Sequence, residues 1–169
     1  SESPPYLESL GIPAQYFNFD DIDTTEAILS LKKDFGVAEE LVEKFFQPYL
    51  YLNRETLAAK NLDMTVVSRR VAEELRKMPG IAFAVSSDDL RSGAVPDTPV
   101  TEAVLANFHE DRSGDIYIGF EPHWFIAEFD GLHVSAAHGS PWTYESQVPI
   151  IGAGPGIEPV SDAGRVETV

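Results

Sequence analysis

The sequence contains no cysteine, which excludes disulfide bonds and thiolate metal sites and leaves His, Asp and Glu as ligands for any transition metal. It has no apolar run of about 18 residues, so no transmembrane helix is expected. It also has no basic start followed by an apolar core, so no signal peptide is expected in this chain.

Basic residues are scarce. The 12 Lys and Arg residues face 28 Asp and Glu residues, which gives a formal net charge of −16. A surface this acidic repels phosphate backbones and anionic lipid, so we expect no nucleic-acid partner and no membrane partner. Solubility or adaptation to salt explains such a charge, and so does an acidic patch for a basic partner or for cations.

The pattern of apolar residues predicts helices alternating with strands. Thr24 or Thr25 can cap a first helix that Gly36 ends, Asp63 caps a helix over residues 64–77, and Thr98 caps a later one. Residues 91–99 form a turn-rich loop. The remaining expected elements are a helix over residues 38–47 and strands at residues 49–53, 81–86, 114–121, 123–129 and 148–152.

This order predicts an α/β fold, with α+β as the alternative, in which helices pack on a small mixed sheet with a strand–helix–strand–helix–strand core. Residues 1–47 form an N-terminal arm and two helices, residues 48–121 form the layered core, and residues 122–169 hold C-terminal strands and a histidine loop. We expect one structural unit. The linker-like start "SESPP" and the strand-like end "RVETV" lead us to expect a piece of a longer chain.

The segment "AAHGSPWTYESQVPII", residues 136–151, places His138 among small residues. Small neighbours clear space for a metal or an anion beside the imidazole. A structural histidine in a tight turn produces the same pattern, so spacing alone leaves both interpretations open.

Other candidates are weaker. Asp130, His133 and His138 lie within nine residues and supply two nitrogens and one oxygen, but Gly131 argues against the helix that best presents ligands at such spacing. His109 lies near a helix end and His123 beside an aromatic strand, and neither position requires a function.

Nucleophile and phosphate-loop motifs are absent. No Ser lies in a Gly-x-Ser-x-Gly elbow, and "GAGPG" at residues 152–156 is not followed by Gly-Lys-Ser/Thr, so a tight turn is expected there. Arg112, in "DRSGD", could bind a carboxylate or phosphate, although a helix end, a glycine stop and a strand start explain the same residues.

Taken in order, "DRSGDIYIGFEPHWFI" and "AAHGSPWTYESQVPIIGAGPGIEP" resemble the C-terminal part of alkaline phosphatase superfamily enzymes. The resemblance is to the phosphate-irrepressible alkaline phosphatases and the type I phosphodiesterase/nucleotide pyrophosphatase group. Those enzymes have an Arg-Ser-Gly-Asp strand start, a Thr/Ser-His-Gly-Ser/Thr-Pro loop and a Tyr-Asp-Thr-His-Val-Pro run. The match covers residues 48–157 and is strongest over residues 111–157.

The resemblance implies a phosphate-ester hydrolase that uses two zinc ions and a Thr or Ser nucleophile, in a periplasmic or secreted protein. It implies that His138 is a zinc ligand. The Tyr-Asp-Thr-His-Val-Pro run is altered to "YESQVP" at residues 144–149, and the family's nucleophile and other metal ligands are absent from this chain. Because catalytic zinc needs about three protein ligands, we expect this chain alone to be inactive and to bind zinc weakly.

Two functions from different classes follow. The first is the C-terminal part of a zinc-dependent phosphatase or phosphodiesterase. The second is a stand-alone acidic protein-interaction module without catalysis, in which the His138 loop is only a turn. A piece of a larger fold also exposes apolar surface where the rest would pack, so we expect self-association through that surface.

Overall fold

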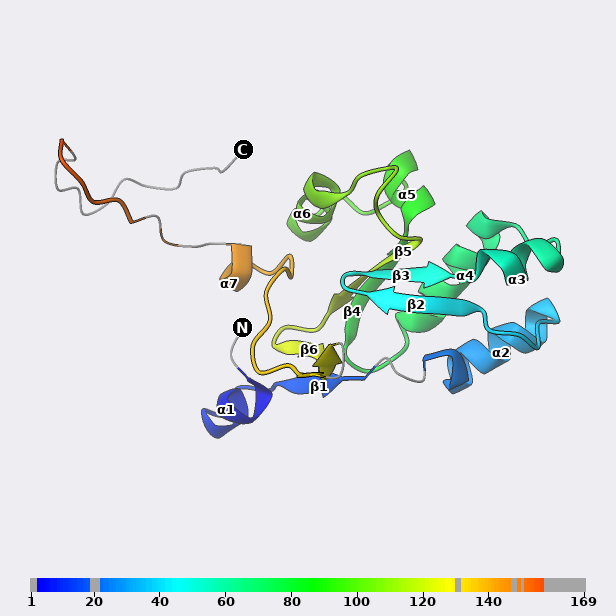
Figure 1. The fold of residues 1–169 in the computed structure, drawn as a ribbon, viewed down its shortest axis with the longest axis horizontal. Coiled ribbons are helices and arrows are strands. Elements are labelled where there is room, and N and C mark those ends of the chain that lie inside the picture. Colours follow the sequence, from blue (N-terminus) through cyan, green and yellow to red (C-terminus); the bar gives the residue numbers. More distant parts are fainter. Residues whose placement is uncertain (1–2, 19–21, 130–131, 147–148, 150, 157–169) are drawn as a thin grey trace.

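A computed structural model describes residues 3–18, 22–129, 132–146, 149 and 151–156. Its helices and strands alternate along the chain, with most of the regular structure before residue 127 (Figure 1). The elements are α1 (Pro4–Ser9), β1 (Gln15–Phe17), the 3-10 helix η1 (Ile22–Thr24), α2 (Glu26–Phe35), β2 (Val42–Phe46), β3 (Tyr49–Leu52), α3 (Arg54–Ala59), α4 (Met64–Leu75), β4 (Ile81–Ser86), α5 (Ser87–Ser92), α6 (Pro99–Asn107), β5 (Ile116–Phe120), β6 (Trp124–Ile126), β7 (Glu128–Phe129), β8 (Leu132–His133) and α7 (Thr143–Ser146).

Side-chain caps begin the three longest helices. Thr25 Oγ1 accepts the backbone N–H of Ile28 in α2, and Asp63 and Thr98 make the equivalent bonds at the starts of α4 and α6. Each cap satisfies one backbone donor that has no partner within the helix. Gly36 ends α2 in the left-handed conformation at φ +66°. The caps expected from the sequence are confirmed.

Four strands form the central sheet in the order β2-β3-β5-β4, and every neighbouring pair is antiparallel. Parallel pairing occurs, among the described residues, in the separate β1–β6 pair, where Gln15 lies opposite Trp124. The α/β fold class and the strand–helix–strand–helix–strand core are confirmed. The expected mixed sheet is instead an antiparallel sheet with the parallel pair beside it.

The helix expected over residues 38–47 is wrong, because residues 42–46 form β2 and pair with β3 in a hairpin. Leu41, Val42, Phe45 and Phe46 fit a helical period, but a run this short also fits a strand. Pairing decides between them: Phe45 lies opposite Leu50, so the segment satisfies its backbone groups through the sheet.

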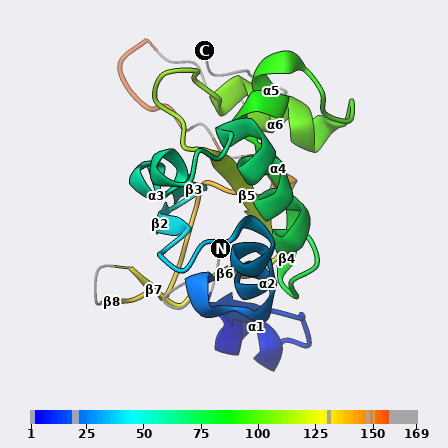
Figure 2. The ribbon, with the colours of Figure 1, turned by 90° about the vertical axis from the view of Figure 1, so that its right-hand side faces the viewer.

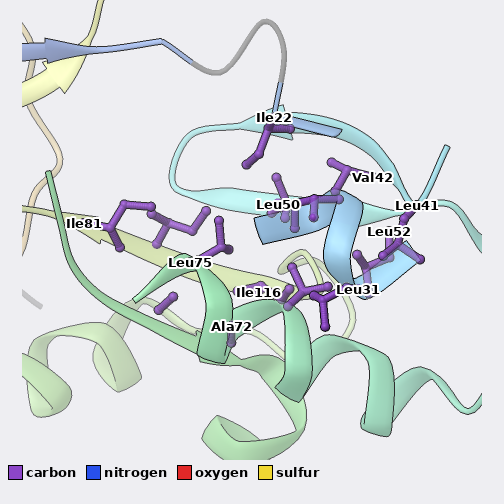
Figure 3. Packing of buried hydrophobic residues seen from close by; sticks show 14 of the residues in the cluster. Ile22, Leu31, Leu41, Val42, Leu50, Leu52, Ala72, Leu75, Ile81 and Ile116 are labelled. Atoms are coloured by element: carbon purple, nitrogen blue, oxygen red, sulfur yellow. The ribbon is translucent and has the colours of Figure 1, made fainter. Parts of the chain in front are cut away.

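One face of the sheet packs against α2 and α4, which lie next to one another on that side (Figure 2). Leu31 from α2 and Leu75 from α4 meet Leu50 and Ile116 from the central strands (Figure 3). All four side chains are at most 1% exposed. Burying side chains of this size stabilises the fold by about 2 kcal/mol each, and this cluster is the main core.

The opposite face of the sheet carries aromatic side chains and packs against α5 and α6. Tyr49 and Tyr117 alternate with the aliphatic residues of their strands and form a second cluster with Leu90 and Val104. Gly119 leaves room for the Phe83 ring, since a Cβ at Gly119 would lie 2.1 Å from it. Figure 1 shows α5 and α6 together, at the opposite end of the molecule from α1 and β1.

Three further expectations about loops and strands differ from the structure or extend beyond the described residues. The expected 123–129 strand is split into β6 and β7. For the expected 148–152 strand, residues 148 and 150 lie outside the described residues, and residues 149, 151 and 152 have no regular structure. The expected 91–99 loop is shorter, because α5 continues to Ser92. The division at residues 47 and 121 stays a prediction.

Within the part of the chain that the structure describes, none of the helices combines the length and the apolar character needed to cross a bilayer.

Burial of Tyr117, helped by neighbouring Tyr49, raises the pKa of Tyr117 to about 12. The unfolded chain loses this proton near pH 10, so above that pH the native state binds more protons and stability falls as pH rises. The expected loss is about 1.4 kcal/mol per pH unit up to about pH 12. Urea unfolding at several pH values measures it.

Tyr117→Phe provides the comparison for this pH dependence, because phenylalanine keeps the ring and removes the titrating hydroxyl. The variant should show a shallower fall in unfolding free energy over the same pH range. Equal slopes for the two proteins would contradict a raised pKa at Tyr117.

Candidate functional site

His138 lies on an irregular segment that follows β8. Residues 136–140 have no regular secondary structure, and the His138 side chain is exposed. Gly139 has φ +94°, a backbone conformation that residues other than glycine rarely adopt, and apart from its two chain neighbours no described residue has an atom within 4 Å of where its Cβ would be. The imidazole is therefore presented toward solvent on a loop whose path depends on Gly139.

Trp142 ties this segment to the central sheet. Its indole Nε1 donates a 3.0 Å hydrogen bond to the backbone oxygen of Phe120, at the end of β5. Its ring meets Phe83 of β4 edge-on, with the ring centroids 6.4 Å apart. A half-buried indole with a satisfied N–H is a directional anchor, and it lies four residues after His138.

Tyr144 makes the second attachment. Its hydroxyl accepts the backbone N–H of His123 at 3.0 Å, and the rings of Tyr144 and His123 stack with centroids 4.7 Å apart. His123 has φ +66°, which is uncommon for a residue with a side chain. Partial burial raises the pKa of the Tyr144 hydroxyl above its usual value.

A hydrogen bond within the segment joins residues on either side of these two anchors. The backbone N–H of Ser140 donates to Glu145 Oε2 at 2.8 Å. The segment that carries His138 is thus attached through Trp142 and Tyr144 and braced by Glu145.

Among the side chains that the structure describes, the histidines do not gather around one point. His109 is exposed in the connection before β5, and His123 lies beneath Tyr144. His133 ends β8, and Asp130 lies outside the described residues. No group of three His, Asp or Glu side chains that could hold a metal ion exists among the residues described.

The "DRSGD" segment has a structural use. Asp115 is buried, and its carboxylate accepts the N–H of Leu52 and a guanidinium N–H of Arg54, both at 2.8 Å. These bonds fix β3 to the start of β5. Arg112 is exposed and makes no ion pair with any residue that the structure describes. In "GAGPG", Gly156 has φ +82° in a turn, as expected.

Comparisons with known proteins bear on this arrangement. No protein-family model matches the chain. A protein named calcium-transporting ATPase from Myroides odoratus is 30% identical over 129 residues, which are 76% of this chain and 23% of that protein. The alkaline phosphatase PafA of Elizabethkingia meningoseptica is 26% identical over 162 residues, 94% of this chain and 28% of the enzyme.

Solved structures show the same likeness. The crystal structure of wild-type alkaline phosphatase PafA superimposes with a TM-score of 0.66 at 24% identity, covering 85% of this chain and 26% of that chain. The resemblance to the alkaline phosphatase superfamily is confirmed. A mutant of the same enzyme matches with a TM-score of 0.66 at 23% identity. The chain spans about a quarter of the length of the relatives it matches.

The sequence did not reveal the residues that hold the segment carrying His138 in place. Trp142 and Tyr144 come soon after His138, so two aromatic residues shortly after a His-Gly pair were the available signal. Their partners are backbone groups of Phe120 and His123, about 20 residues earlier in the chain. Side chain to backbone contacts over that separation leave no pattern in the sequence.

Trp142→Phe keeps an aromatic ring and removes the N–H that bonds to Phe120. We expect faster amide hydrogen exchange at residues 137–140, because the segment loses one of its two attachments, and a loss of about 1 kcal/mol in unfolding free energy. Exchange followed by NMR checks it. In α4, exchange should rise no more than the loss in unfolding free energy accounts for, which serves as the internal control. Unaltered exchange at residues 137–140 would show that Trp142 does not anchor the segment.

Proposed function

We propose that this chain is part of a metal-dependent phosphate-ester hydrolase and that His138 supplies one metal ligand there. The observation that carries the proposal is the likeness to PafA over 94% of the chain in sequence and 85% in structure. The Myroides relative is named an ATPase. Hydrolysis of a phosphate ester and of ATP both transfer a phosphoryl group to water.

The described residues do not form a complete zinc site. A catalytic zinc takes about three protein ligands and keeps an open position, whereas no group of three His, Asp or Glu side chains that could hold a metal ion exists among the described residues. The exposed imidazole and the anchored loop suit a single ligand. In the proposal, the other ligands and the nucleophile come from polypeptide beyond this chain.

The contribution of this chain is therefore positional. Trp142 and Tyr144 fix the segment that carries His138, and Gly139 sets its path. Zinc, when bound in the complete enzyme, would polarise the phosphoryl oxygens and lower the pKa of the nucleophile. A phosphate ester as substrate and a periplasmic or secreted location belong to the same proposal, as does self-association through exposed apolar side chains such as Phe46 and Leu105.

Tests of the proposal use the complete polypeptide that the gene encodes around this chain. Its zinc content and its hydrolysis of 4-nitrophenyl phosphate should fall at least about tenfold in His138→Ala. His109→Ala is the matched control, because it removes another exposed imidazole, and it should retain both properties. Full zinc content and full activity in His138→Ala would overturn the assignment of His138.

The isolated chain should release no phosphate with or without added zinc, since one histidine cannot hold a catalytic ion. Zinc-dependent turnover by the pure chain that disappears in His138→Ala would contradict this. A reading frame that begins near Ser1 would instead favour the acidic interaction module.

A further inference from the structure

A pocket of about 360 Å³ lies beside β4, and His138 is not among its lining residues. Its walls come from β4, α5, the connection between α5 and α6, α6 itself, Arg76 at the end of α4, and Trp142. This volume falls in the range of small-molecule sites, which are mostly apolar with a few polar groups. The apolar side chains in its lining include Phe83, Val85, Val95, Val100, Val104 and Trp142.

Flat aromatic surfaces shape the pocket. Phe83 stacks on Tyr117, with an interplanar angle of 4° and ring centroids 5.8 Å apart, and Trp142 meets Phe83 at 77°. The side chains of Phe83 and Trp142 both line the pocket. Rings held at fixed angles favour a planar apolar guest, which can stack on one ring and meet the edge of another.

Arg76 brings a positive charge to this apolar lining. It lies at the end of α4, and its Nη1 donates to the backbone oxygen of Ala84 at 2.9 Å. It makes no ion pair with any residue that the structure describes, although Arg69 and Arg70 of the same helix pair with Asp89 and Asp34. A guanidinium has five N–H donors, so donors remain for a ligand.

Asp89, a carboxylate that also lines the pocket, is already engaged. Its Oδ1 accepts from Arg69 at 2.8 Å, and its Oδ2 accepts from the Ser86 hydroxyl at 2.8 Å. Among the charged side chains that line the pocket, Arg76 therefore remains available to bind an anion. One guanidinium in a chain of net charge −16 suits a single negative charge better than a doubly charged phosphate.

We propose that this pocket binds a small aromatic carboxylate. The ring system lies against Phe83, Val104 and Trp142, and the carboxylate accepts hydrogen bonds from Arg76. The site is independent of the phosphatase proposal, because its lining does not include His138. Trp142 belongs to both the pocket and the His138 segment, so a bound molecule contacts the residue that anchors this segment.

Titration calorimetry on the full chain tests the charge requirement, with 2-naphthoate as the probe and 2-naphthylmethanol as its neutral counterpart. Arg76→Gln should weaken 2-naphthoate binding about tenfold and leave 2-naphthylmethanol binding unchanged, because only the carboxylate uses the guanidinium. Arg70→Gln removes a charge from the same helix outside the pocket, so it should bind both probes as the wild type does. Equal loss in the two variants would overturn the role of Arg76.

A filled pocket tests the location. Val100→Trp places an indole in the cavity from α6 and should weaken binding of both probes at least about tenfold. Ala94→Leu fills the same pocket from the α5–α6 connection, and near-UV circular dichroism verifies that each variant is folded. Wild-type affinity in both folded variants, or no binding of 2-naphthoate to the wild-type chain at millimolar concentration, would overturn the proposal.

Discussion

Strand β5 is paired on both edges and buried on both faces, with β3 on one side and β4 on the other. Its alternate residues feed two different clusters, since Ile116 and Ile118 enter the main core while Tyr117 enters the aromatic one. The backbone carbonyl of its last residue, Phe120, accepts a hydrogen bond from the Trp142 indole N–H. Both cores and one anchor of the His138 segment therefore depend on the placement of this strand.

Local chemistry made much of this fold predictable. Thr25, Asp63 and Thr98 precede apolar periods, and capping needs only nearby groups, so these helix starts were visible in the sequence. The strand around Phe45 was not predictable, because its apolar residues fit a helical period and a strand period equally well. Only pairing with β3 decides for the strand. The antiparallel order of the sheet depends equally on long-range pairing.

The candidate site divides in the same way. A His-Gly-Ser-Pro segment indicated where a ligand could be presented, and the structure shows an exposed His138 there. The anchors at Phe120 and His123 were hidden from sequence reasoning, because they use backbone groups that any residue could supply. The pocket was hidden too, since Arg76, Val104 and Trp142 are far apart in the chain.

Trp142 connects these two parts of the molecule. Its N–H is committed to β5, one side of its ring meets Phe83, and the same side chain lines the cavity beside β4. A residue that is hydrogen-bonded at one end and packed along its ring has little freedom to move without disturbing both contacts. The position of the His138 segment is consequently coupled to the packing of the aromatic face, and through Phe83 and Gly119 to the path of β5.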